Sequence, residues 1–427
     1  MEQQEKFDFI TQKVKDRPIN RRKLMRKTMI TASMAVIFGL IACLTFLTLQ
    51  PIINNWLHPK EEIEQIEIPV AEDEVLPEEM LEHEQQILEP SQEVIDTIKN
   101  EIQLELQDYK ELNQQIYAIT REMQKAMVTV TGVSKQMDWF NDPYESSAAS
   151  TGFIFAQNNA EILIFVPTHV IRGEEKIEVT FGDGKKVAAY LKGRDYNTEL
   201  SVVAVAKDSL AESTTEKIQL LPLGSSKKEG ILASPVIALG SPLGKSSVVY
   251  GMITSVGGKV SMVDTNYELL TTDIYGSTKA EGILADYEGR VIGIIYQKEN
   301  DKNGENIISA LGITELKEVL QRMGNGIPNT YIGTKVTEVP EEIHEVKGIP
   351  LGVYVTGISM DSPAMMAGIQ SGDVIIQIDQ TTITSLKDYK QVITESSPGE
   401  VKEMIIMRQG VEGYKALQVE ITMGELQ

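Results

Sequence analysis

The longest uninterrupted hydrophobic stretch lies close to the N-terminus. Residues 28–49 form a run of 22 positions without a charged side chain. As a helix this run would extend about 33 Å, enough to cross a hydrocarbon layer about 30 Å thick. Six Lys and Arg side chains lie between residues 17 and 27, directly before this run, and acidic residues follow it. The positive-inside rule therefore predicts a cytoplasmic tail (1–27) and a single-pass transmembrane anchor (28–50) in the cell membrane. A cleaved signal peptide is the alternative, but the apolar core of such a peptide spans only about 7–15 residues.

The segment after the anchor is strongly acidic. Residues 61–100 hold fourteen Asp and Glu side chains against Lys99, a net charge of −13, with prolines scattered between them. Such a segment repels itself and offers few apolar residues for a core. Residues 51–92 are therefore expected to form an extended acidic stalk rather than a ligand site.

From residue 93 the apolar positions repeat with helical spacing. Between Ile95 and Ala126 they recur at steps of three, four or seven residues, interrupted only at Glu105. This spacing predicts a helix within residues 93–127. Two interpretations stay open: a short coiled coil that joins protomers, or one amphipathic helix that docks on the following domain.

Beyond residue 127 the pattern changes to short β-branched runs separated by turns. These runs lie at 161–166, 176–181, 186–191, 200–206, 235–239, 248–256 and 290–295. Such a series is typical of an antiparallel barrel or sandwich, here two barrels over 128–323 that end in a helix at 314–322. A glycine-rich linker at 324–328 then precedes a smaller domain of strands and short helices over 329–425. The predicted fold class is mainly β.

Composition narrows the function classes. A chain of 427 residues, 42% hydrophobic and 24% charged, has room for several folded domains. Its net charge of −22 argues against a nucleic-acid partner, because phosphate binding requires a surplus of Lys and Arg. The single Cys43 excludes an intramolecular disulfide and a cysteine-rich metal site. No metal and no cofactor are expected.

One of the four histidines has a distinctive place, because only His169 lies within the β-rich region, at the end of an apolar strand. Further segments follow it in order: Gly193-Arg194-Asp195, Leu200-Ser201-Val202-Val203, Gly240-Ser241-Pro242-Leu243-Gly244 and Gly251-Met252-Ile253-Thr254-Ser255. Together they resemble the motifs of the HtrA (Do-like) family of bacterial trypsin-like serine proteases. Ser362-Pro363-Ala364 and Gly372-Asp373-Val374-Ile375 are similar to the PDZ domain of that family. The resemblance implies a double six-stranded β-barrel, a PDZ domain and a homotrimer.

The resemblance also locates the catalytic positions. His169 matches the catalytic histidine, and Glu199 stands where the family has aspartate. Counting back from the intact motif at 288–294 puts Ala280 at the position of the serine nucleophile. Ser277 would reach that position only if the loop shifted by three residues. Because a triad needs a hydroxyl that the histidine deprotonates, the resemblance implies a degenerate triad and a pseudoprotease.

The motif formed by Tyr331, Ile332, Gly333 and Thr334 matches the loop with which a PDZ domain binds a peptide carboxylate. The expected partners are unfolded or C-terminal peptides of proteins, and the expected role is a membrane-anchored, extracytoplasmic peptide-binding scaffold. Two alternatives stay open. One is an active serine-type endopeptidase in extracytoplasmic protein quality control. The other is a purely structural role, in which the stalk and the helix act as an assembly device.

Overall fold

The computed structural model describes residues 34, 63–68, 106–137, 143–298 and 306–426. The predicted anchor and the predicted stalk therefore lie outside the described residues, apart from Met34 and residues 63–68. Within the part of the chain that the structure describes, no helix is both long enough and apolar enough to cross a bilayer.

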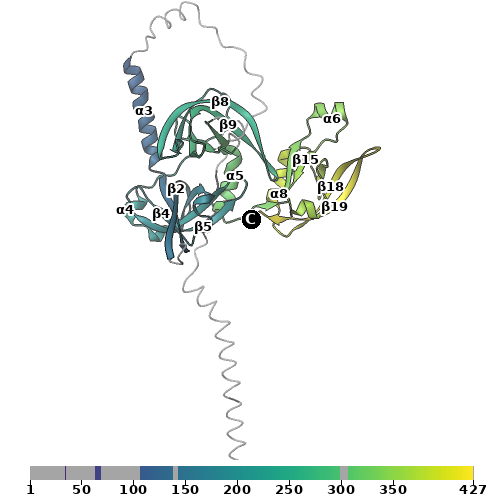
Figure 1. Ribbon diagram of the computed structural model, residues 1–427, viewed down its shortest axis with the longest axis horizontal. Helices are drawn as coiled ribbons and strands as arrows, with labels where there is room; N and C mark the ends of the chain where they lie inside the picture. Colours follow the sequence, from purple (N-terminus) through teal and green to yellow (C-terminus); the bar gives the residue numbers. More distant parts are fainter. Residues whose placement is uncertain (1–33, 35–62, 69–105, 138–142, 299–305, 427) are drawn as a thin grey trace, which may run out of the picture. The chain divides into compact units, whose positions relative to one another are not determined.

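Two closed six-stranded barrels follow one another along the chain (Figure 1). The first, in the order β1-β2-β3-β6-β5-β4, consists of β1 (Met127–Met137), β2 (Pro143–Gln157), β3 (Glu161–Pro167), β4 (Lys176–Thr180), β5 (Lys186–Asp195) and β6 (Leu200–Ala206). The second, in the order β10-β11-β12-β9-β8-β7, consists of β7 (Pro235–Ser241), β8 (Ser247–Met262), β9 (Thr265–Tyr275), β10 (Glu281–Ala285), β11 (Val291–Ile295) and β12 (Ile307–Gly312). The predicted pair of barrels is confirmed.

The most apolar strands line the barrel interiors. In β3 and β6, six of seven residues are buried, and the two strands pair along their whole length. One hydrophobic cluster combines side chains of both barrels, with Phe153 stacked on Phe165 at 5.2 Å between ring centroids and Ile237 and Ile283 contributed by the second barrel. Burial of this shared cluster stabilises the barrels as a pair.

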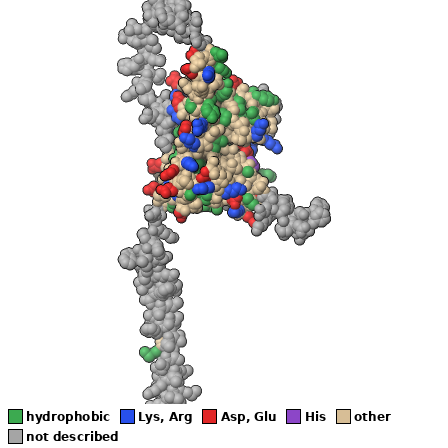
Figure 2. Space-filling model, turned by 90° about the vertical axis from the view of Figure 1, so that its left-hand side faces the viewer, with side chains coloured by type: hydrophobic (Ala, Val, Ile, Leu, Met, Phe, Trp, Pro, Cys, Tyr) green, Lys and Arg blue, Asp and Glu red, His purple; other side chains and the backbone are tan. Residues whose placement is uncertain are grey.

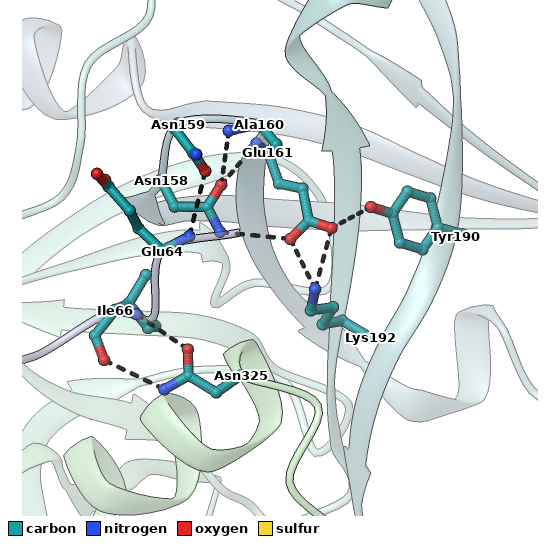
Figure 3. Close-up of polar contacts among 9 residues, drawn as sticks. All are labelled: Glu64, Ile66, Asn158, Asn159, Ala160, Glu161, Tyr190, Lys192 and Asn325. Carbon is teal, nitrogen blue, oxygen red and sulfur yellow. Dashed lines mark hydrogen bonds and ion pairs between the residues drawn. The ribbon is translucent and has the colours of Figure 1, made fainter. Parts of the chain in front are cut away.

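A short segment upstream of the barrels packs against their surface (Figure 3). Ile66 is buried and lies against Gly324 at the end of α5 (Ile313–Gly324). The Asn325 side chain accepts a hydrogen bond from the Ile66 N–H at 2.9 Å and donates one to the Ile66 carbonyl at 3.2 Å. Residues 63–68, which the sequence assigns to the stalk, are thus bound to the barrel surface through Ile66.

Figure 3 also shows a buried carboxylate beside this segment. Glu161 accepts hydrogen bonds from Lys192 Nζ at 2.7 Å and from the Tyr190 hydroxyl. Burial opposes ionisation of Glu161, but these donors outweigh it and lower its pKa. The carboxylate therefore has local partners and needs no ligand.

The described part of the helix predicted within residues 93–127 is α3 (Leu106–Gln124), and residues 93–105 lie outside the described residues. Ile116 and Met123 pack into the hydrophobic cluster of the barrels, whereas Tyr109 and Leu112 are exposed. The C-terminal half of the helix therefore docks on the barrels, as the amphipathic interpretation predicts. The coiled coil that would use the exposed half stays a prediction.

The C-terminal domain is a small sheet with short helices. Its elements are β13 (Thr330–Tyr331), β14 (Thr334–Glu338), α6 (Glu341–Lys347), β15 (Val353–Ile358), α7 (Pro363–Met366), β16 (Val374–Ile378), β17 (Thr381–Thr382), α8 (Leu386–Glu395), β18 (Val401–Gly410), β19 (Gly413–Thr422) and β20 (Gly424–Glu425). The main sheet runs β14-β15-β16-β18-β19, so β14 is an edge strand. A separate hydrophobic cluster around Tyr389, Val355 and Ile406 forms the core of this domain.

The charges of the folded part are mixed. On the face drawn in Figure 2, Lys and Arg side chains alternate with Asp and Glu, with no large area of one sign. This pattern agrees with the sequence, in which −13 of the net −22 falls between residues 61 and 100.

Candidate functional site

A cleft of about 450 Å³ holds the predicted catalytic positions. Residues of both barrels line it, including Pro167, His169 and those at 198–200, 278–282 and 294–298. The fold thus brings His169, Glu199 and Ala280 to one cleft, although they are far apart in sequence.

His169 follows β3 directly, in the 3-10 turn η3 (Thr168–Val170), and its side chain is 60% exposed. Its Nδ1 lies 3.4 Å from Oε1 of Glu281, the residue after Ala280. Oε2 of Glu281 accepts a hydrogen bond of 2.7 Å from Ser150 Oγ. No hydrogen bond or ion pair joins His169 to Glu199 among the described residues, so Glu281 is the carboxylate paired with this histidine.

Glu199 is directed to a different partner. Its backbone is left-handed, with φ of 56°, and its carbonyl accepts a 2.7 Å hydrogen bond from the Thr168 N–H. Its Oε1 lies 2.8 Å from Nζ of Lys298, and both side chains are about half exposed. An exposed ion pair of this kind contributes only about 0.2–1 kcal/mol. In this arrangement the carboxylate neutralises Lys298 and does not fix a histidine tautomer.

Ala280 is buried, at 5% exposure, among apolar side chains of the second barrel. Its N–H donates a 3.0 Å hydrogen bond to the Ser277 carbonyl, which also accepts one of 3.1 Å from Gln297 Nε2. In a trypsin-like triad the N–H of the nucleophile residue belongs to the oxyanion hole. Here that donor is already bonded within its own loop.

Ser277 is held by the same loop. Its N–H donates to the Pro242 carbonyl at 2.9 Å, and its Oγ accepts the Lys279 N–H at 3.1 Å. It is absent from the lining of the cleft, and the described residues show no hydrogen bond between it and His169. The structure thus directs the Ser277 hydroxyl into the loop.

Sequence reasoning missed three residues of this cleft region. Glu281 directly follows Ala280, so its proximity to the histidine was available from the alignment. Ser150 lies 131 residues away on β2, and Lys298 follows β11 without any motif that marks it. Only the closure of the two barrels brings Ser150 and Lys298 to this region.

The predicted carboxylate loop connects β13 to β14. The N–H groups of Ile332, Gly333 and Thr334 converge on one carboxylate, that of Asp264, at 2.7, 2.8 and 2.9 Å. Gly333 has φ of 93°, and a Cβ at this position would lie 2.2 Å from the Ser362 Cβ. Glycine is therefore required both by the backbone conformation and by the available space. The loop has the geometry of an anion-binding nest.

No group of three or more His, Cys, Asp or Glu side chains in the described part of the chain is arranged to hold a metal ion.

Comparison with known proteins gives the same two domains. Residues 150–294 match the trypsin-like peptidase domain and residues 326–422 the PDZ domain. The serine protease Do-like HtrA of Bacillus subtilis is 27% identical over 294 residues, 64% of each chain. A probable periplasmic serine endoprotease DegP-like of Hahella chejuensis is 28% identical over 301 residues, 67% of this chain and 61% of the relative.

These alignments span less than two thirds of either relative's length. Among solved structures, the HtrA-type protease AlgW with tripeptide superposes with a TM-score of 0.50 at 22% identity, over 73% of this chain and 97% of that one, a likeness of fold. The chain therefore carries a trypsin-like peptidase domain and a PDZ domain of the HtrA/DegP family.

Proposed function

We propose that this protein is an HtrA-like protease homologue that no longer cleaves peptide bonds and that binds peptides through its PDZ domain. The observation that carries the proposal is Ala280 at the nucleophile position, with its N–H bonded to the Ser277 carbonyl. Both the attacking hydroxyl and a donor for the oxyanion are then missing from the cleft.

The magnitude of this loss decides between a slow enzyme and an inactive one. Removal of the serine from a triad lowers kcat by a factor on the order of a million. An enzyme that turns over about 10 times per second would fall to about one event per day. A second contribution to catalysis is also missing. Glu199, at the position of the triad carboxylate, pairs with Lys298 and therefore does not orient His169.

The PDZ domain depends on none of these groups. Backbone N–H groups bind the terminal carboxylate of a peptide, and the edge strand β14 offers main-chain partners for the peptide backbone. We propose unfolded or C-terminal peptides of proteins as its ligands.

The sequence supports a location for this activity. The apolar run at 28–49 with its basic N-terminal flank supports a single membrane anchor, with the two domains outside the cytoplasm. Assembly as a homotrimer is part of the same proposal and follows from the family resemblance.

The test of inactivity compares the full-length chain with two variants, His169→Ala and Ser277→Ala. Each protein is incubated with unfolded casein and with a fluorophosphonate probe. We expect no turnover and no labelling in all three. Turnover that either substitution abolishes would establish the rival function, a serine endopeptidase, and would overturn the proposal.

The test of peptide binding uses a library of peptides with free C-terminal carboxylates and the same peptides as C-terminal amides. Binding should require the free carboxylate and should be lost in Gly333→Trp, whose side chain has no room beside Ser362. Binding that persists in Gly333→Trp would show that another surface holds the peptide.

A further inference from the structure

The carboxylate loop of the PDZ domain already contacts a carboxylate of the same chain. Asp264 Oδ2 accepts the N–H groups of Ile332 and Gly333, and Oδ1 accepts the N–H of Thr334. Oδ1 also receives the Thr334 hydroxyl and the Tyr389 hydroxyl, each at 2.7 Å. These five donors saturate a carboxylate, which offers about four lone-pair sites. The side chain is 5% exposed and shielded from water.

Two further hydrogen bonds join the β8–β9 hairpin to the edge strand β14. Its N–H donates to the Thr334 carbonyl at 2.7 Å, and Asn266 Nδ2 donates to the Val336 carbonyl at 3.1 Å. One donor is a backbone N–H and the other is a side-chain amide, and both are bonded to carbonyls of β14. A peptide added to this sheet edge would need the same main-chain carbonyls, so the hairpin and a peptide compete for them.

The peptidase domain holds this tip in place. Val263 and Asp264 form the two-residue connection between β8 and β9, closed by the pair Met262 and Thr265. Asp264 has φ of 56°, a conformation that Asp adopts readily at tight turns. The Asn197 side chain donates to the Val263 carbonyl at 2.9 Å and accepts its N–H at 3.2 Å. The carboxylate is therefore presented in a fixed geometry.

The charge of Asp264 is what sets this contact apart from an ordinary domain contact. Among the described residues no Lys or Arg pairs with it, so only N–H and O–H dipoles balance its charge. A neutral side chain would join the two domains at a lower desolvation cost. The arrangement is instead the one by which the loop would hold the terminal carboxylate of a peptide.

We propose that Asp264 is an internal ligand of the PDZ domain, and that a peptide C-terminus binds only when it displaces the β8–β9 tip. This inference rests on the proposed function, since it assigns the regulation of the same loop. Because the tip is tethered, it competes at a high effective concentration. The apparent affinity for a free peptide is then reduced by the fraction of molecules in which the loop is open.

The experiment uses the full-length chain and its Asp264→Ala and Glu268→Ala variants. Glu268 lies on β9 of the same hairpin, and its removal changes the net charge equally without touching the loop. The first measurement is hydrogen–deuterium exchange over residues 330–338 without any peptide. The second is the affinity, by fluorescence anisotropy, for the carboxylate peptide library and for its amidated twin.

We expect residues 332–334 to exchange slowly in the unmodified chain and in Glu268→Ala, and at least about tenfold faster in Asp264→Ala. The same substitution should raise the affinity for carboxylate peptides by about tenfold or more and leave amidated peptides unbound. Unchanged exchange in Asp264→Ala would overturn the inference whatever the peptides do.

The remaining outcomes separate the two proposals. Equal peptide affinity in all three chains would overturn the internal-ligand inference and leave peptide binding standing. If no peptide binds even to Asp264→Ala, the proposed function fails, and the exchange data still decide whether Asp264 occupies the loop.

Discussion

Two loops of this molecule, 277–280 and 331–334, lie where backbone N–H groups could bind a negatively charged oxygen. The two loops differ in the acceptors to which these N–H groups are bonded. In the loop 277–280 the Ala280 N–H donates to the Ser277 carbonyl of the same loop. In the loop 331–334 three consecutive N–H groups converge on the Asp264 carboxylate. Catalysis at the 277–280 loop would also need a nucleophilic side chain, whereas anion binding at the 331–334 loop needs a specific residue only at Gly333. A site made from backbone alone survives sequence change more easily than one that needs a specific nucleophile.

The largest effect is expected at the strand that follows the catalytic loop. Gly282 has φ of 136°, and a Cβ there would lie 1.9 Å from the Leu239 carbonyl oxygen, a backbone atom of the paired strand β7. We expect Gly282→Ala to destabilise the second barrel by about 3–5 kcal/mol, from backbone strain and displacement of β7. Urea unfolding followed by hydrogen exchange in β7 and β10 measures this change.

The control for this change is Gly289→Ala. Gly289 also has a positive φ, 79°, but its nearest neighbour would be 3.4 Å away, so only the cost of the conformation, about 1–2 kcal/mol, applies. Equal effects at both positions would mean that the close approach of β10 to β7 is relaxed in solution.

The second effect concerns the PDZ loop itself. We expect Gly333→Ala to cost about 2–3 kcal/mol, because the new Cβ meets Ser362 and the left-handed backbone is strained. Displacement of the loop should also weaken binding of carboxylate peptides at least about tenfold. Thermal unfolding and fluorescence anisotropy measure the two quantities.

Gly348 supplies the matched control. Its φ is 66°, and a Cβ there would meet no atom within 4 Å. Gly348→Ala should lower the free energy of unfolding only by the cost of a left-handed backbone at alanine, and it should leave peptide affinity unchanged. If it weakened binding as much as Gly333→Ala, the loop geometry would not be the cause.

A smaller effect is expected from the hydroxyl that supports the loop. Tyr389 is fully buried, and its hydroxyl contacts both Asp264 and Thr334. Burial and the Asp264 charge raise the pKa of Tyr389 well above its usual value, so the hydroxyl stays a donor. Tyr389→Phe should lower the free energy of unfolding by about 1–2 kcal/mol.

This contribution has a defined pH dependence. Because the folded-state pKa of Tyr389 is raised, the stabilisation is fully present below the ordinary tyrosine pKa of about 10 and is lost as the pH rises through the folded value. Tyr414→Phe, in the same domain, changes a partly exposed hydroxyl and should have little effect. An equal loss of unfolding free energy in the two variants would mean that the contacts of the Tyr389 hydroxyl with Asp264 and Thr334 do not stabilise the domain.

The sequence predicted the strands whose apolar residues form continuous runs. β3 and β6 begin at the residues expected from their pattern. The expected runs omit five strands of the barrels: β1, β2, β9, β10 and β12. In β9 the apolar residues alternate with Thr, Asn and Asp, so no continuous apolar run marks the strand.

The candidate sites were predictable to a different degree. His169, Glu199 and Ala280 share one cleft, as the motif order implies. Their partners were not predictable, because the pairs His169 with Glu281 and Glu199 with Lys298 depend on side-chain directions at the meeting of two barrels. The contact of Asp264 with a loop about 70 residues later arises from domain packing, which no local pattern encodes.

The smallest effect is expected from the substitution that supplies the missing hydroxyl. Ala280→Ser supplies the missing hydroxyl, and if that were the only defect, activity would rise by a factor on the order of a million. We expect casein turnover to stay within about tenfold of the unmodified chain. The N–H of residue 280 would still bond to the Ser277 carbonyl, and Glu199 would still face Lys298.

The double variant Ala280→Ser with His169→Ala is the control, because it identifies any reaction that is not triad chemistry. Strong fluorophosphonate labelling that requires His169 would contradict this expectation. It would mean that substrate can break the bond between the N–H of residue 280 and the Ser277 carbonyl, so that the 277–280 loop, like the 331–334 loop, can still bind an anion.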